Sequence, residues 1–301
     1  MRCLVTGGAG FIGSHLVDRL LKEGYEVTVI DDFSEGELFN LPIGNKKMTI
    51  YDLSITEDIS PYFREVDYVF HLAAKTRPQE SIIKPILYNL VNIDGIVNVL
   101  NACVKNKIKK LVFVSSSSIY GNQDKFPTSE TAPPIIMSPY ALTKWTGEQY
   151  CKLFERIYGL KSNYIRPFNV FGPRQSPDSE YSAVIPKFIS SIKNNLVHNI
   201  WGDGKQKRDF IYVDDVVEML ILAATSPVSG EAFNAGCGEN ISINNLYNII
   251  CRLMKKNIIP NHIDPKFEPR LTLAKIDKAK KLLNWKPKVK LEEGIKKILR
   301  I

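Results

Sequence analysis

Short apolar runs alternate with longer segments of helical period through the first half of the chain. The run 2–6 is β-branched, and apolar positions at 12, 16 and 20 then follow at the spacing of one helix face. The pattern predicts strands at 2–6, 26–30, near 48–51, 67–72, 110–115 and 161–166, and helices at 11–23, about 82–106 and 139–158. This alternation predicts an α/β fold, a Rossmann-type doubly wound parallel sheet with its ligand at the carboxyl ends of the strands.

The second half has a different texture. Residues 168–205 are rich in Pro, Gly, Asn and Ser and are expected to form loops around one helix near 183–194. The pattern beyond them predicts a helix at 214–224, a short strand at 232–235, and helices near 242–256, 275–284 and 291–300. We therefore expect one domain over 1–167 and a smaller C-terminal α/β lobe over 168–301, with about 208–237 returning to the first domain.

Composition narrows the class of protein. The 301 residues are 44% hydrophobic and 24% charged, as in ordinary globular chains. No apolar run approaches the ~20 residues that cross a bilayer, and no signal-peptide cleavage pattern is visible, so we expect a cytoplasmic protein without a membrane partner. The net charge is +8, but the lysines are dispersed, so no nucleic-acid partner is predicted. The five cysteines have no CxxC spacing and are expected as buried thiols, and the histidines show no metal-ligand spacing.

A glycine cluster separates the first predicted strand from the first predicted helix. It reads either as Gly8-x-Gly10-x-x-Gly13 or as Gly7-x-x-Gly10-x-x-Gly13. Either spacing gives a tight turn whose backbone can touch a pyrophosphate at a helix N-terminus. A glycine-rich surface hairpin is the alternative, and the flanking strand and helix argue against it. The second strand leads into Asp31, an acid suited to a ribose hydroxyl, which favours NAD over NADP.

Two further groups suggest redox chemistry on a hydroxyl. Tyr140 and Lys144 lie four residues apart on a predicted helix and therefore share a face. The pKa of a free tyrosine is near 10, and we expect a lysine and an oxidised nicotinamide beside Tyr140 to lower it. Such a pair alone is more often two solvated neighbours. Serines 115–118 follow an apolar strand, where one hydroxyl could stabilise an alkoxide and the others could simply cap the strand.

Taken in order, these motifs resemble those of an extended short-chain dehydrogenase/reductase, in the nucleotide-sugar epimerase/dehydratase branch. The resemblance covers essentially all 301 residues. It is carried by TGGAGFIGSHL (6–16), YDLS (51–54), FHLAA (70–74), VNIDG (91–95), SSSSIYG (115–121), SPYALTK (138–144), RPFNVFGPRQ (166–175), GDGKQKRDFIYVDDV (202–216) and LNWKPKVKLEEG (283–294).

The resemblance implies roles for individual residues. NAD would be the cofactor, held by Gly7, Gly10, Phe11, Ile12, Gly13, Asp31, Asp52, Leu53, Ala73, Ala74, Asn92, Tyr140 and Lys144. The matched catalytic residues are Ser116, Tyr140 and Lys144. A nucleotide sugar, expected to be UDP-linked, would contact Ser116, Tyr140, Asn169, Arg208 and Glu268 in the substrate-binding lobe. The family also implies a homodimer through the helices at about 82–106 and 139–158.

The residues after Ser116 discriminate within the branch. Similar 4,6-dehydratases carry an Asp-Glu pair at Ser117 and Ser118, and related decarboxylases usually carry a Glu at the second position. Without these carboxylates, the chemistry that the site can support is oxidation and re-reduction at one carbinol. We therefore predict 4-epimerisation through a 4-keto sugar that turns about its pyrophosphate, with Tyr140 as the base. A nucleotide-sugar 4-reductase, another epimerase/dehydratase, and a non-catalytic NAD-binding regulator are the alternatives.

The C-terminal part departs from the family pattern. An Arg and an Asp that contact the nucleotide in relatives align with Pro265 and Glu268, so Lys266 or Arg270 could replace the arginine. A tyrosine that excludes N-acetylated sugars aligns with Thr272. Glucose, galactose or their N-acetyl forms are therefore the expected sugars. Two tryptophans, at 201 and 285, are expected as core or loop anchors, and a histidine at 71 as a local hydrogen-bond partner.

Overall fold

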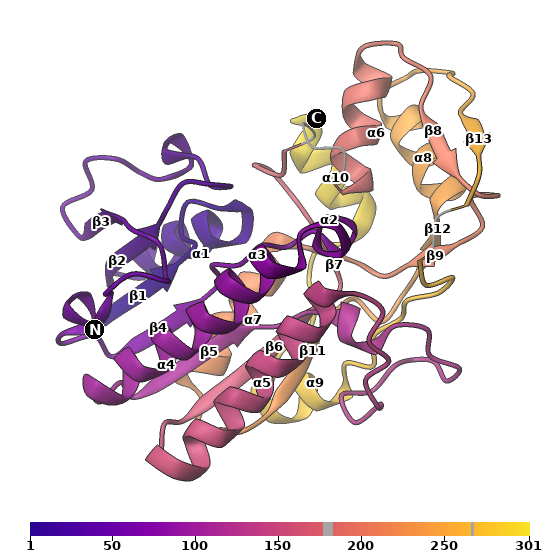
Figure 1. Ribbon diagram of the computed structural model, residues 1–301. Coiled ribbons are helices and arrows are strands. Elements are labelled where there is room, and N and C mark those ends of the chain that lie inside the picture. Colours follow the sequence, from indigo (N-terminus) through magenta and orange to yellow (C-terminus); the bar gives the residue numbers. More distant parts are fainter. Residues whose placement is uncertain (177–182, 266–267) are drawn as a thin grey trace.

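A seven-stranded parallel sheet forms the centre of the molecule. The computed structural model describes residues 1–176, 183–265 and 268–301. The strand order is β11-β6-β5-β4-β1-β2-β3 (Figure 1). The strands are β1 (Arg2–Thr6), β2 (Glu26–Asp31), β3 (Met48–Asp52), β4 (Tyr68–His71), β5 (Lys110–Val114), β6 (Ser162–Pro167) and β11 (Ala232–Ala235). The order reverses between β1 and β4, the position at which doubly wound sheets bind their ligands.

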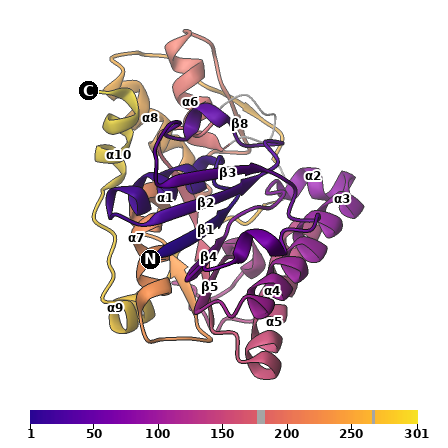
Figure 2. The ribbon, with the colours of Figure 1, turned by 90° about the vertical axis from the view of Figure 1, so that its left-hand side faces the viewer.

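Helices cover both faces of the sheet (Figure 2). One face carries α1 (Phe11–Lys22) and α7 (Val213–Thr225), and the other carries α2 (Pro78–Ile83), α3 (Pro85–Asn89), α4 (Gly95–Lys105) and α5 (Pro139–Tyr158). Alternate residues of β1 serve the two cores: Cys3 and Val5 pack in one, and Leu4 packs in the other. A strand that is apolar on both faces suits a covered parallel sheet. The predicted Rossmann-type α/β fold is confirmed.

The long helix predicted near 82–106 is interrupted. Pro85 has no backbone N–H, and Lys84 before it lies outside the helical region at φ −121° and ψ 51°, so α2 ends and α3 begins there. A wider π turn at Leu90–Asp94 then joins α3 to α4. Such π turns are frequent at functional sites. Single 3-10 turns lie at Leu38–Asn40, Ser60–Phe63 and Ser117–Tyr120.

Short elements make up the rest of the second half of the chain. They are β7 (Asn169–Phe171), α6 (Val184–Lys193), β8 (Asn199–Trp201), β9 (Lys207–Arg208), β10 (Phe210–Tyr212), β12 (Ile241–Ser242), α8 (Ile243–Leu253), β13 (Asn261–Ile263), α9 (Asp277–Leu283) and α10 (Leu291–Leu299). Of these, α9 packs against β11 of the central sheet and against α7. The pairs are β10 with β7, β12 with β9, and β13 with β8. The helices were predicted to within a few residues. The strands in this part were missed, because two or three residues carry no measurable hydrophobic period.

The chain returns to the sheet between β10 and β12. There α7 packs on the sheet, and β11 adds a seventh strand with Ala232 opposite Tyr164 of β6. The division into domains at residue 167 stays a prediction.

Within the described residues, one helical stretch is long and apolar enough to cross a membrane by length and composition alone. It is Pro85–Lys105, and 44% of its window is buried inside the protein. Val99, Leu100 and Cys103 of this stretch are fully buried in the core between the sheet and α5. The part of the stretch that forms α4 (Gly95–Lys105) is therefore a core helix.

Candidate active site

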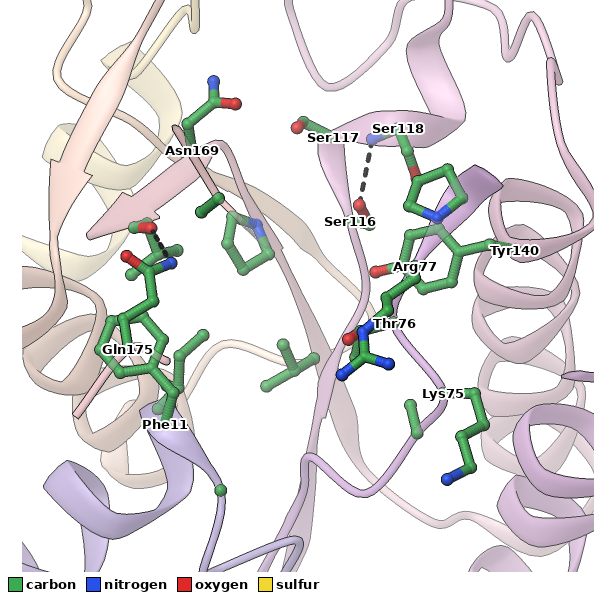
Figure 3. Close-up of a pocket in the computed structure, with 18 of the residues that line it drawn as sticks. Phe11, Lys75, Thr76, Arg77, Ser116, Ser117, Ser118, Tyr140, Asn169 and Gln175 are labelled. Atoms are coloured by element: carbon green, nitrogen blue, oxygen red, sulfur yellow. Dashed lines mark hydrogen bonds between the residues drawn. The ribbon is translucent and has the colours of Figure 1, made fainter. Parts of the chain in front are cut away.

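A cavity of about 1290 Å³ lies where the carboxyl ends of the central strands meet the C-terminal lobe. Its walls come from the glycine turn, the ends of β2, β4 and β5, the start of α5, and β7 to β9 of the lobe. Figure 3 shows Ser116 and Tyr140 on one wall, with Phe11, Asn169 and Gln175 facing them. The cavity therefore spans both halves of the chain and is large enough for a dinucleotide and a second ligand.

The glycine turn is built so closely that side chains are excluded from it. A Cβ on Gly13 would lie 2.0 Å from the carbonyl oxygen of Gly7. Gly7 itself has φ +70°, and a Cβ there would lie 2.6 Å from the amide nitrogen of Ala73. Gly7, Gly10 and Gly13 line the cavity, whereas Gly8 is not among its lining residues. The chain thus brings bare backbone and the N-terminus of α1 to the cavity, which fits a dinucleotide pyrophosphate.

Asp31 ends β2 at the floor of the same cavity. Its Oδ2 accepts a hydrogen bond from the Ala9 amide at 2.8 Å, and its Oδ1 accepts one from the Phe33 amide at 2.9 Å. Burial raises the pKa of this carboxyl, and the two backbone hydrogen bonds oppose that rise. Both oxygens keep a lone pair for further donors, so the carboxylate suits a ribose diol and disfavours a 2′-phosphate.

Three of the predicted residues converge at the end of β5. The N-cap Ser138 begins α5 by accepting a hydrogen bond from the Ala141 amide at 3.2 Å, so Tyr140 lies in the first turn. Lys144 follows one turn later and donates from Nζ to the Val114 carbonyl at 2.9 Å. Ser116 Oγ accepts from the Ser118 amide at 3.1 Å. The hydroxyl of Tyr140 points into the cavity beside Ser116 (Figure 3).

Burial dominates the acid–base behaviour of this group. It raises the pKa of Tyr140, while a hydrogen bond with Ser116 acts in the opposite direction. It also lowers the pKa of Lys144 to about 7. The sequence predicts that Lys144 lowers the tyrosine pKa, but no such effect of Lys144 is found, because the buried ammonium is itself disfavoured. An added positive charge at the cavity is what would favour the phenolate.

The remaining predicted cofactor residues divide into two groups. Phe11, Ile12, Leu53, Ala73 and Ala74 all line the cavity. Asp52 and Asn92 do not. Asp52 ends β3 with an exposed side chain. Asn92 is buried and clamps the Lys75 backbone, accepting from its amide at 2.8 Å and donating to its carbonyl at 3.0 Å. It therefore shapes the cavity wall from behind.

The predicted substrate residues meet at the lobe. Arg208 is buried and forms an ion pair with Glu268 at 3.0 Å. Asn169 donates from Nδ2 to the Asp209 carbonyl at 2.9 Å and to Thr272 Oγ1 at 3.4 Å. All of these except Asp209 line the cavity.

The sequence suggested Lys266 and Arg270 as replacements for the missing arginine, and neither is found in the described lining of the main cavity. Lys266 lies outside the described residues. Arg270 is 84% exposed, its side chain reaches only to 4.0 Å from Asp203, and it does not line the main cavity.

Some cavity residues were not recognised from the sequence. Trp201, expected as an anchor, lines the cavity wall at the end of β8, whereas Trp285 is a buried anchor whose Nε1 donates to the Asp215 carbonyl at 2.9 Å. Ser118 Oγ and Gln175 Oε1 are buried cavity atoms that have no hydrogen-bond partner in the described part of the chain. Gln175 is the last residue of the motif at 166–175, but nothing in the sequence indicates that its side chain enters the cavity.

His71 and the cysteines have structural positions. His71 has its predicted local partner, with Nδ1 2.7 Å from Thr6 Oγ1. Four of the five cysteines are buried, and Cys237 is half-buried.

Comparison with known proteins defines the class. The sequence profile of the NAD dependent epimerase/dehydratase family matches residues 3–236, so the chain belongs to this family and its cofactor is NAD. The UDP-glucose 4-epimerase of Mycolicibacterium smegmatis is 36% identical over 99% of this chain and 97% of its own length.

Solved structures give the same result. A UDP-N-acetylglucosamine 4-epimerase from Methanobrevibacter ruminantium, solved with UDP-N-acetylmuramic acid, has a TM-score of 0.96 at 39% identity and covers 99% of this chain and 97% of its own. The Thermotoga maritima UDP-glucose 4-epimerase with UDP-glucose has a TM-score of 0.96 at 38% identity and covers 100% and 98%.

Proposed function

We propose that this chain is an NAD-dependent 4-epimerase of a UDP-linked sugar. The observation that carries the proposal is the convergence of Ser116, Tyr140 and Lys144 in a cavity that runs from the glycine turn to Arg208. Ser117 and Ser118 stand where dehydration would need carboxylates, and both line this cavity. The relatives are named as UDP-sugar 4-epimerases, which agrees with a site equipped only for reversible oxidation.

The chain's own residues supply the proton chemistry. Tyr140, as the phenolate, removes the proton of the sugar 4-hydroxyl, and Ser116 donates a hydrogen bond to the same oxygen. The glycine turn and Asp31 would hold NAD, which would supply reversible hydride transfer at carbon 4. Arg208 holds the pyrophosphate while the ketone turns its other face, and Tyr140 then gives the proton back. Asp31 holds the adenosine ribose through the lone pairs left free by its backbone contacts.

The substrate sugar is expected to be glucose, galactose or an N-acetyl form. Thr272 lines the cavity with a small side chain, and its Oγ1 already accepts from the Asp209 amide at 3.2 Å. A bulky residue at this position would reduce the space beside the sugar.

A substrate panel tests the proposed function. Purified protein is incubated without added cofactor with UDP-, dTDP- and GDP-sugars, including N-acetyl forms, and product stereochemistry is followed by NMR. Inversion at carbon 4 of a UDP-sugar is expected, because the cofactor is regenerated in each cycle. Product that forms only with stoichiometric NAD(P)H would identify a 4-reductase. NAD binding without conversion of any sugar would identify a non-catalytic protein.

We also propose that two copies of the chain associate through the helices at about 82–106 and 139–158, which correspond to the end of α2, α3, the π turn, α4 and α5. These helices are neighbours, since Ser81 Oγ of α2 accepts from the Tyr140 amide at 3.1 Å. Large apolar side chains are exposed on them, namely Ile83, Ile86, Leu90 and Leu142, and Ile82, which is also exposed, lines the cavity. A patch of this kind on adjacent helices is typical of a protein interface.

Replacing Ile86 with Asp is expected to convert the dimer to a monomer. Ile86 is 85% exposed in the single chain, so a charge there costs little until a second copy covers it. Light scattering after size-exclusion chromatography measures the mass. Ile259→Asp is the control, because Ile259 is 80% exposed but lies outside these helices. A monomeric wild-type chain, or equal masses for all three, would contradict the interface.

A further inference from the structure

A buried ion pair lies directly behind the catalytic strand end. Glu148 and Arg166 are 0% and 3% exposed. The guanidinium binds both carboxylate oxygens, from Nε to Oε1 at 2.8 Å and from Nη2 to Oε2 at 2.6 Å. Ser115 Oγ adds a third donor to Oε1 at 2.5 Å. None of these contacts has a part in the mechanism derived above.

The helix geometry connects this ion pair to the reacting groups. Tyr140, Lys144 and Glu148 are spaced four apart on α5 and share one face of it. Lys144 binds the carbonyl of Val114, and Glu148 binds the side chain of Ser115. Two successive turns of α5 thus hold two successive residues at the end of β5. The next residue along the chain is Ser116.

The far side of the ion pair is equally well fixed. Arg166 Nη1 donates to Tyr120 Oη at 2.8 Å, and Tyr120 donates to Asn234 Oδ1 of β11 at 2.6 Å. Tyr120 ends the turn that begins one residue after Ser116. All of these side chains are buried and have hydrogen-bond partners. Because every polar group in a buried network of this kind is paired, the network is rigid and has one geometry.

We propose that Glu148 is a positioning residue that acts through Ser115 to hold Ser116 at the distance from Tyr140 that proton transfer requires. The inference rests on the proposed epimerase function, because its effect is on the step in which Ser116 and Tyr140 share one substrate oxygen. Proton transfer needs hydrogen-bond distances, and a small displacement of either group slows it strongly. Arg208, the residue proposed to hold the pyrophosphate, bonds to the Lys207 carbonyl and to Glu268, and among the described residues it has no bond to this network.

Ser115→Ala is the decisive variant. Replacing Glu148 itself would leave the buried guanidinium unpaired and could unfold the protein, whereas Ser115→Ala removes one hydrogen bond and keeps the ion pair. We expect kcat to fall on the order of tenfold with KM unchanged, since misplacement of the reacting groups affects the chemical step. NAD content after purification is expected to stay at the wild-type level.

Ser229→Ala is the matched control. Ser229 Oγ donates to Glu155 Oε1 at 2.6 Å, so it makes the same type of hydrogen bond to the same helix, away from the cavity. Both variants remove a serine hydroxyl that is bonded to a glutamate of α5, but only Ser115→Ala should lower kcat. Equal kcat in the two variants, or a loss confined to KM, would overturn the positioning role.

A spectroscopic titration separates this inference from the proposed function. Phenolate absorbance of Tyr140, obtained by subtracting the Tyr140→Phe protein in each background, needs no sugar. Because the hydrogen bond with Ser116 lowers the pKa of Tyr140, Ser115→Ala is expected to raise it. An unshifted titration would refute the positioning role even in an active enzyme. If the wild type converts no UDP-sugar but the titration shifts, the proposed function fails and the positioning stands.

Discussion

Tyr140→Phe is expected to lower turnover by about 10²–10⁴-fold while NAD stays bound, because the change removes only the oxygen that moves the proton. The ring itself is buried and packs edge-on against Tyr88 at 6.4 Å, and these contacts remain. Initial rates of epimerisation give the turnover, and absorbance of the coenzyme released on denaturation gives the occupancy.

Tyr158→Phe is the control for this change. Tyr158 ends the same helix with 56% of its surface exposed, far from the cavity, so its activity should match the wild type. Substantial activity in Tyr140→Phe would remove this residue from the mechanism. Loss of NAD in that variant would mean that the phenol is needed for binding and leave its role as a base unsupported.

Gly13→Ala is expected to abolish coenzyme retention and to reduce the free energy of unfolding by about 1–3 kcal/mol. The new Cβ would lie 2.0 Å from the Gly7 carbonyl oxygen and 2.9 Å from the Gly8 Cα, so the turn or the helix must move. Both neighbours are backbone atoms and cannot rotate away. Coenzyme content and denaturant unfolding measure the two effects.

Gly10→Ala provides the comparison within the same motif. A Cβ on Gly10 would meet the Gly7 carbonyl oxygen at 3.3 Å, so a shift of a few tenths of an ångström relieves it. This variant should keep most of its coenzyme. If both variants lose NAD equally, close backbone packing does not explain the requirement for Gly13.

Local patterns made the N-terminal half predictable. The strand, glycine turn, helix and acid at Asp31 each leave a clear signal within a few residues, and the structure brings them together in one cavity. Tyr140 lies next to Ser116 because α5, the helix between the parallel strands β5 and β6, begins at the sheet edge where β5 ends. Pro85 is a helix-breaking residue, but the apolar period continues on both sides of it, so the sequence predicts one helix where the structure has two.

Long-range contacts limited the prediction of the lobe. Arg208 and Glu268 are 60 residues apart, and nothing local in the sequence indicates that they form an ion pair. Trp201 lines the cavity from β8, a short strand whose partner β13 lies far along the chain. The pKa of Tyr140 depends on how completely the residue is buried, which is decided by packing rather than by its spacing from Lys144.

The return of the chain to the central sheet through β11 has a consequence for how this protein can be divided. A fragment ending at residue 167 would lack α7 and would leave β6 with an open edge, so hydrophobic surface of the first core would face water. The lobe cannot be cut out as a module either, because its elements come from segments on both sides of α7 and β11. Exchange of sugar specificity between relatives by grafting would therefore have to replace several separate loops rather than one contiguous half.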